Sequence, residues 1–328
     1  MNIYITLDYE LFLNDYTGDV DNCLIIPSHE LLRVLNKHQI KATFFVDAAY
    51  IYRLNELRGR YQGLQEDYKK VVSHVKEIAS QGQKIGLHLH PQWFYSDYDG
   101  DKWIIDFDHY KLSDMAVLEA SRLFRECKIM LEELIGSKID SFRAGGYSIQ
   151  TFKAFPQLMK ELDIKSDSSV LSNAKNLSKL HYYDYSSLKT TDSYTFEDDV
   201  LLIENNGSLR EYPISTSTFN YVTYCVSRLK MRKLKNNKNW GNGGDVSSHH
   251  RRSLVKNIFN KMFHPIVMSA SIDYQGFAFF DMVYSEYLRK GKRDFVIIGH
   301  PKNFSPASLS MLDAFLYKVK NESSFKTI

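Results

Sequence analysis

The chain has 328 residues, of which 44% are hydrophobic and 25% charged. This composition is typical of a folded globular protein and excludes a disordered or fibrous chain. Its 42 basic residues exceed its 39 acidic residues by three, so no overall charge indicates binding to nucleic acid. The length fits two domains or one large α/β domain. The aromatic content of 14% suits a cleft that stacks on sugar rings, or simply a tyrosine-rich core and surface.

The three cysteines, Cys23, Cys127 and Cys225, are odd in number and widely separated. They predict reduced thiols in a reducing compartment, because no spacing resembles a disulfide framework or a metal knuckle. The first basic residue is Arg33, so we expect no signal peptide. No run of 18 apolar residues occurs, so we also expect no membrane-spanning helix. These features predict a cytoplasmic protein and leave its oligomeric state open.

Short apolar runs rich in β-branched and aromatic residues alternate with amphipathic segments. The predicted strands, in chain order, are 2–8, 41–46, 84–90, 141–145, 164–167 and 294–299. The predicted helices are 28–38, 68–81, 113–135, 151–162 and 306–320. Ser28 is the expected N-cap of the first helix, and Gly82 and Gly136 end the second and third. This alternation predicts β/α units around a parallel sheet or barrel.

Residues 228–256 differ from the rest, because they contain nine lysines and arginines and one acidic residue. The centre of this segment, 236–244, is polar and rich in glycine. The segment predicts either a solvated mobile insertion or a basic flap over an anionic ligand, such as a sugar diphosphate or a membrane surface.

Polar residues follow the predicted strands, at the edge where α/β barrels build active sites. Asp8 and Glu10 lie two residues apart and therefore face the same side of an extended strand, as do His88 and His90. Two imidazoles and a carboxylate are a common ligand set for zinc or another divalent ion. Taken singly, these residues could instead be solvated acids and structural histidines.

Three further strand ends carry candidate residues. Arg143 is placed to pair with a carboxylate and lower its pKa. It precedes Gly145 and Gly146, which either let a backbone N–H approach a ligand or simply make a turn. Asp167 alone would fit a helix N-cap. His300 follows the most apolar strand, where an imidazole could donate a proton to a leaving group.

In order and spacing, these segments resemble the polysaccharide deacetylase family, carbohydrate esterase family 4. The matching segments are TLD at 6–8, ATFFV at 42–46, IGLH at 85–88, FRAGGY at 142–147, KSDSSV at 165–170 and GHP at 299–301. Segments 210–215 and 324–327 also look familiar, and 220–285 matches least. The resemblance implies a single domain over 1–328, folded as an irregular (β/α) barrel, often of seven strands.

The family removes acetyl groups from N-acetylated sugars with the help of a divalent metal. By position, the resemblance implies that Asp8 is the base that activates water and that Arg143 is its tether. It implies that His88 is a metal ligand and His300 the acid that protonates the departing amine. Asp167 would then orient His300 or tune its pKa.

Two positions depart from the family pattern. Tyr9 stands where the family has a second aspartate, and Gln92 stands where it has a second histidine. We therefore expect the ligands to be Glu10 (or Asp8), His88 and His90. The expected ion is Zn2+, with Co2+, Ni2+ or Mn2+ as alternatives. The same departures would also fit a weakened or absent metal site.

The leading hypothesis is a metal-dependent hydrolase that removes N-acetyl groups from a polysaccharide or glycoconjugate precursor. One alternative is hydrolysis of another non-peptide C–N amide bond on the same barrel. The other is a non-catalytic relative that binds a glycan or a partner protein. The expected partner is thus a carbohydrate rather than nucleic acid.

Overall fold

The computed structural model of the chain describes residues 1–188, 190–242 and 265–328. Its main element is a nine-stranded sheet in the order β10-β11-β7-β6-β3-β2-β1-β14, with β15 paired to β1. Seven of these strands are mutually parallel along the sheet. They are β1 (Asn2–Tyr9), β2 (Thr43–Asp47), β3 (Lys84–Leu89), β6 (Ser141–Ala144), β7 (Ser166–Asp167), β11 (Leu209–Glu211) and β14 (Asp294–Gly299).

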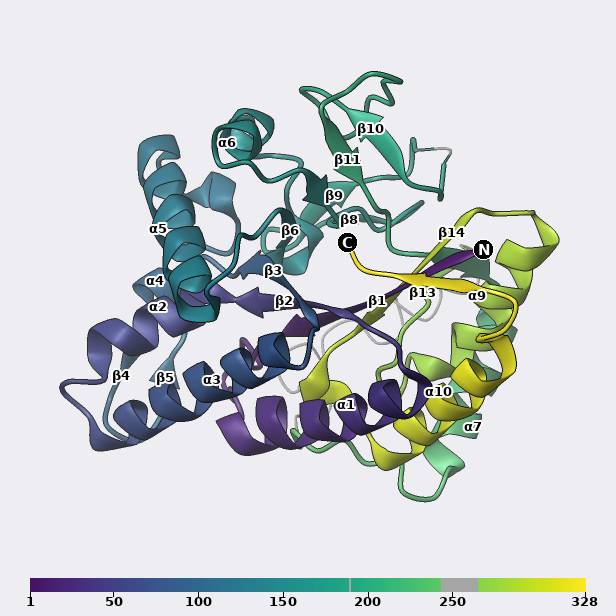
Figure 1. Cartoon of the computed structure of the whole chain (residues 1–328), viewed down its shortest axis with the longest axis horizontal. Helices are drawn as coiled ribbons and strands as arrows, with labels where there is room; N and C mark the ends of the chain where they lie inside the picture. Colours follow the sequence, from purple (N-terminus) through teal and green to yellow (C-terminus); the bar gives the residue numbers. More distant parts are fainter. Residues whose placement is uncertain (189, 243–264) are drawn as a thin grey trace.

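Two further strands extend this sheet. The antiparallel β10 (Tyr194–Phe196) pairs with β11. Strand β15 (Ser324–Lys326) pairs with the first residues of β1, and β2 pairs with later residues of β1. The two ends of the chain therefore lie side by side in the sheet (Figure 1).

The sheet curls so that its two ends meet through irregular backbone pairing. The N–H of Ser215 donates to the carbonyl of Val296 on β14 over 3.0 Å, and the N–H of Ile298 donates to the carbonyl of Ala270 over 2.9 Å. The predicted irregular (β/α) barrel is thus confirmed. The predicted count of seven strands is not exact, because eight strands of the sheet are parallel once β15 is counted, and the whole sheet has nine.

Helices cover the outer face of the curled sheet (Figure 1). They are α1 (Ile26–His38), α2 (Ala48–Leu57), α3 (Gln62–Ser80), α4 (Gln92–Tyr95), α5 (Val117–Ile135), α6 (Phe155–Glu161), α7 (Tyr221–Lys233), α9 (Phe277–Arg289) and α10 (Pro306–Val319). The remaining strands form three hairpins or ribbons. These are β4 (Asp97–Tyr98) with β5 (Trp103–Ile104), β8 (Lys175–Leu177) with β9 (Tyr182–Asp184), and β12 (Thr216–Phe219) with β13 (Ile266–Ser269).

Side chains alternate along β1 between two cores. Ile5 and Tyr9 belong to the large core between sheet and helices. Tyr4 belongs to a smaller core that also contains Phe45 and Val296, inside the curl of the sheet. Residues of this strand that lie an even number of positions from Tyr4, including Asp8, therefore point to the inside of the barrel. Polar residues can gather at the tip of the barrel.

Most predicted elements are present, and the differences lie mainly at helix starts. Ser28 is buried inside α1 instead of capping it, because a π-helical turn at Asp21–Ile25 leads directly into the helix. Helix α3 begins at Gln62, and its end is set by Gly82, which has a left-handed φ of 76°. Helix α6 begins only at Phe155, after an irregular turn.

The basic insertion expected at 228–256 stays a prediction. Its first residues, Arg228 to Lys233, lie in helix α7. Residues 243–256 lie outside the described residues. The three cysteines are free thiols, and Cys23 and Cys127 are buried. In the described ranges, no helix is long and apolar enough to cross a membrane.

Candidate active site

The parallel register brings the predicted site residues to one end of the sheet. His88 on β3 pairs with Asp47 on one side and with Arg143 on the other. Asp8 on β1 pairs with Phe45 on β2, and β2 lies two strands away from the strand that carries Arg143. Because all these strands run in the same direction, residues from distant parts of the sequence meet at their carboxyl ends.

Glu10, His88 and His90 form one group, which we call the strand-tip cluster. One ligand atom from each residue lies within 4.8 Å of the others. Oε2 of Glu10 is 3.0 Å from Nε2 of His88 and 2.5 Å from Nε2 of His90. All three residues are at most 6% exposed. The structure therefore brings together the three residues expected to bind a metal, and it selects Glu10 over Asp8 as the carboxylate of the group.

A lysine that the sequence analysis did not single out also contacts this cluster. Nζ of Lys302 donates to Oε1 of Glu10 over 2.8 Å and to the carbonyl of Leu11 over 2.7 Å. Burial alone would raise the pKa of Glu10, but Lys302 and His90 outweigh burial and hold that pKa well below its usual range. Glu10 is thus an anion between an ammonium and two imidazoles.

The two histidines are held in different ways. Nδ1 of His88 lies 2.7 Å from the carbonyl of Arg143, which leaves Nε2 of His88 directed at Glu10. His90 is placed through its backbone N–H, which donates to Asp47, and Nδ1 of its ring has no hydrogen-bond partner among the described residues. A Cβ on Gly145 would lie 2.6 Å from that Nδ1, so the glycine is needed for space.

Asp8 lies beside the cluster and is paired with Arg143. Nη1 of Arg143 is 2.6 Å from Oδ1 of Asp8, and its other N–H groups bond to Thr6 and Ser168. Burial would raise the pKa of Asp8, but Arg143, with His88 and His300, keeps it below its usual value. The predicted tether is therefore present, and Asp8 is ionised.

His300 faces Asp8 from the tip of β14. Its Nε2 is 3.5 Å from Oδ2 of Asp8. Its Nδ1 and its backbone N–H each lie 2.8 Å from an oxygen of Asp273. Burial alone would lower the pKa of His300, but Asp273 outweighs burial and raises this pKa to about 9. At neutral pH the imidazole therefore carries a proton.

The expected role of Asp167 needs correction. The carboxylate that orients His300 is Asp273, whereas Asp167 accepts a hydrogen bond from Ser169 and interacts with Glu211. Burial raises the pKa of Asp167 to about 6 and that of Glu211 well above its usual value. Strand β7 pairs with β11, and this pairing joins the two carboxyls.

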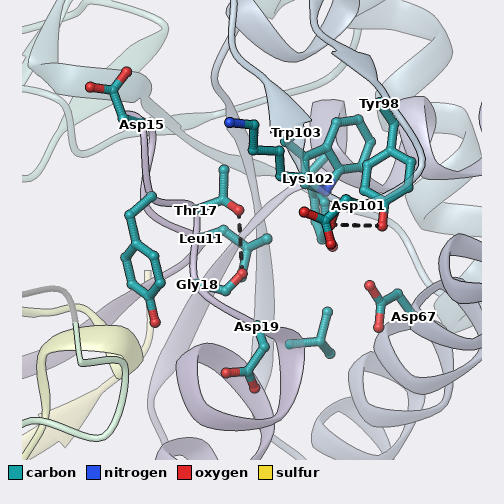
Figure 2. Close-up of a pocket in the computed structure, with 13 residues that line it drawn as sticks. Leu11, Asp15, Thr17, Gly18, Asp19, Asp67, Tyr98, Asp101, Lys102 and Trp103 are labelled. Atoms are coloured by element: carbon teal, nitrogen blue, oxygen red, sulfur yellow. Dashed lines mark hydrogen bonds between the residues drawn. The ribbon is translucent and has the colours of Figure 1, made fainter.

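A pocket of about 430 Å³ begins at Leu11, the residue after Glu10. Aromatic side chains, among them Trp103 and Tyr98, form part of its wall, and Asp67 and Asp101 are among its acidic residues (Figure 2). The strand-tip cluster itself does not line this pocket, as far as the described residues go. The two are linked through Leu11, whose carbonyl accepts from Lys302.

One buried hydroxyl in this pocket is unsatisfied. Tyr50 lines the pocket and is 2% exposed, and its hydroxyl has no hydrogen-bond partner within the described part of the chain. Burial also raises the pKa of Asp67, another lining residue, to about 6. An aromatic wall with unsatisfied polar groups is typical of a site for a small polar ligand.

Comparison with known families bears on this arrangement. Residues 26–165 match the family model for polysaccharide deacetylases. This part of the chain is thus similar to polysaccharide deacetylases. The matched segment contains His88, His90 and Arg143. Asp8, Glu10 and His300 lie outside that segment, and the sheet brings them to it. Comparison with curated proteins gives no match.

One solved structure agrees in fold with this chain, and two others are less similar to it. A Mycobacterium smegmatis protein described provisionally as a polysaccharide deacetylase has a TM-score of 0.50 and 13% identity, over 99% of this chain and 85% of its own. PuuE allantoinase has a TM-score of 0.48 and 13% identity, over 99% and 87%. The family 4 pseudoenzyme BA3943 of Bacillus anthracis has 0.43 and 12%, over 99% and 63%. The likeness to the Mycobacterium smegmatis protein concerns the fold alone.

Sequence reasoning missed three residues of the site. Asp47 ends a predicted strand, so the polar strand-end rule that found His88 could have found it. Lys302 lies two residues after His300, but in a 3-10 turn where no strand periodicity applies. Asp273 lies in a loop and meets His300 only through tertiary structure, so no local signal indicates it.

Proposed function

We propose that this protein is a divalent-metal-dependent hydrolase that removes an N-acetyl group from a carbohydrate. The observation that carries the proposal is the 3.5 Å approach of Asp8 and His300 beside the strand-tip cluster. An ionised carboxylate and a protonated imidazole thus face each other next to three groups able to bind a metal. The similarity of residues 26–165 to polysaccharide deacetylases supports the same chemistry.

The cluster residues fit a divalent cation by their chemistry. One carboxylate and two imidazole nitrogens form a ligand set found in catalytic zinc sites. The contact of Nδ1 of His88 with a backbone carbonyl is the usual outer contact of a metal-binding histidine. A divalent ion held there would supply Lewis-acid polarisation of the acetyl carbonyl.

The proton transfers belong to two residues of the chain. Asp8, held ionised by Arg143, takes a proton from the water that attacks the acetyl carbon. A C–O bond forms as the C–N bond breaks, and His300 gives its proton to the departing nitrogen. The products are acetate and an amino sugar. Asp273 keeps the His300 ring oriented and stabilises its charged form.

The pocket that begins at Leu11 would hold part of the sugar chain. Tyr98, packed against the buried Trp103, lines the pocket with an aromatic ring, and Asp67 and Asp101 can accept hydrogen bonds from sugar hydroxyls (Figure 2). The unpaired hydroxyl of Tyr50 would find a partner in the same ligand. The proposal therefore places the uncleaved part of the substrate next to the first strand.

Acetate release from N-acetylated oligosaccharides tests the proposal. Protein stripped with a chelator should be inactive, and Zn2+ or Co2+ should restore activity. Asp8→Asn and His300→Gln should each lower kcat by about 10²–10⁴-fold, the usual contribution of a general acid or base. His109→Gln is a matched control, because the ring of His109 contacts Asp106 and stacks on Tyr95, neither of which is a proposed catalytic or metal-binding residue.

Two results would contradict the proposal. Full activity after complete metal removal would exclude the metal, and unchanged acetate release by Asp8→Asn would exclude the base. Circular dichroism of each variant is needed, because removing one partner of the buried Asp8–Arg143 pair costs about 3–5 kcal/mol of stability.

Lys302 favours a second candidate function. Its ammonium already balances the charge of Glu10 over 2.8 Å, so the cluster could be stable without a metal ion. The barrel would then hydrolyse a different non-peptide C–N amide bond without a metal. Metal analysis of purified protein separates the two candidates, since this second function requires activity with no bound ion.

A further inference from the structure

A second group of metal-binding side chains lies on the helical face of β1. His29 is on α1, and His74 and Glu77 are on α3, and we call these three residues the helix cluster. One ligand atom from each lies within 4.8 Å of the others. Nε2 of His29 is 3.1 Å from Oε2 of Glu77, and the rings of His29 and His74 are 4.7 Å apart between centroids.

One feature of His74 is not explained by the ion pair between His29 and Glu77. It is 3% exposed, and its Nε2 is buried with no hydrogen-bond partner among the described residues. Its other nitrogen, Nδ1, is 2.9 Å from the hydroxyl of Tyr9. A buried polar atom without a partner is costly, and this one belongs to a residue that is grouped with His29 and Glu77.

We propose that His29, His74 and Glu77 form a second divalent-metal site, of the class that binds Zn2+ or Co2+. A carboxylate and two imidazoles are the ligands such ions prefer, and His74 and Glu77 are three residues apart on one helix, hence on one face of it. The half-exposed side chains of His29 and Glu77, at 41% and 45%, leave the site open to solvent.

Tyr9 gives this site an outer contact. When Nε2 of His74 binds a cation, the ring proton must lie on Nδ1, where it is donated to the oxygen of Tyr9. Tyr9 lies between Asp8 and Glu10 in the sequence but faces the helices. The metal would therefore tie α1 to α3 and brace the strand that carries the strand-tip cluster from behind.

The test uses Co2+ titrated into chelator-treated protein, followed by visible absorption and bound stoichiometry. His88→Ala removes a ligand of the strand-tip cluster, so binding that remains reports the helix cluster and does not depend on hydrolysis. We expect His88→Ala to keep one Co2+ per chain and to melt at a higher temperature with the ion than without it.

Ligand variants in the His88→Ala background complete the test. Adding His74→Gln or Glu77→Gln should weaken this binding at least tenfold, and Tyr9→Phe about 10–100-fold. Glu77 is largely exposed, so Glu77→Gln stays informative if His74→Gln fails to fold. His109→Gln should change nothing. Loss of all Co2+ from His88→Ala alone, or retention of it with Glu77→Gln and His29→Gln combined, would overturn the proposal.

Discussion

The strand-tip cluster and the helix cluster contain the same kinds of groups, two histidines and a glutamate, in different surroundings. Glu10, His88 and His90 are at most 6% exposed, whereas His29 and Glu77 are close to half exposed. Charged groups surround the buried cluster and hold it in place. The helix cluster reaches the surface through His29 and Glu77 and has few charged groups around it. Similar ligand sets thus occur once inside the barrel and once outside it, on opposite faces of β1.

The difference lies in what surrounds the ligands. Around the strand-tip cluster, Asp8 and His300 are positioned to move protons, and Arg143 fixes the charge of Asp8. Around the helix cluster the described structure offers Tyr9, a weak acid whose pKa burial raises further, and the neutral amide of Gln81, which donates to Glu77. A metal at the first site could take part in catalysis, whereas a metal at the second would act as a structural link.

The largest expected effect separates the two clusters by activity. His88→Ala should lower kcat/KM for an N-acetylated oligosaccharide at least ~10³-fold, because a Lewis acid contributes several kcal/mol. His74→Gln should lower it tenfold at most, since His74 lies behind the strand. Steady-state kinetics at saturating Zn2+ measures both. Equal losses would show that the two clusters do not have the separate roles assigned to them.

Asp273→Asn sharpens the account of the proton donor. Loss of the carboxylate that raises the pKa of His300 to about 9 should lower that pKa. The alkaline limb of the kcat/KM profile should therefore move to lower pH, and the rate at neutral pH should fall about 10–100-fold. If the alkaline limb of the variant stayed at the same pH as that of the wild-type protein, another group would be the acid. Restoration by Asp273→Glu would support a positioning role.

Gly145→Ala tests how closely the strand-tip cluster is packed. The new Cβ would lie 2.6 Å from both Nδ1 of His90 and the carbonyl of Leu89, so the ring must move. We expect metal affinity to fall about 10–100-fold and stability to fall by about 1–3 kcal/mol. Gly63→Ala on α3 is the control, since nothing lies within 4 Å of its Cβ. Calorimetric Zn2+ titration would decide, and unchanged affinity would contradict the packing argument.

The sequence predicts those parts of the site that depend on local periodicity. Asp8 with Glu10, and His88 with His90, were expected to converge because strand residues two apart share a face. The helix cluster escaped notice, because α1 and α3 each look like ordinary amphipathic helices and His29 meets Glu77 only through tertiary structure. The contact between Asp273 and His300 likewise depends on tertiary structure, because Asp273 lies in a loop. The fold was more accessible, because each strand and most helices carry their own pattern.

The error over Asp167 has a physical origin that can be tested. Its strand was predicted, but its pairing with β11, which brings Glu211 beside it, was not. Two buried carboxyls side by side repel each other when ionised, so one retains a proton. This pair therefore should influence stability against pH without being part of either cluster.

Glu211→Gln should have the smallest effect, and one confined to stability. Burial raises the pKa of Asp167 from 3.8 to about 6, so the folded state binds more protons than the unfolded state between these values. The stability contribution is complete below pH 3.8 and is lost as the pH rises through about 6, with a slope of about 1.4 kcal/mol per unit. Burial and Asp167 raise the pKa of Glu211 well above its usual value, so Glu211 contributes in the same sense, and Glu211→Gln removes that contribution.

The free energy of unfolding of Glu211→Gln should therefore fall less between pH 4 and pH 7 than that of the wild-type protein. Denaturant titrations of metal-free protein at several pH values measure this difference. Metal-free protein is needed because ions bound at either cluster would add their own pH dependence. Identical slopes for the two proteins would mean that the pair does not share a proton.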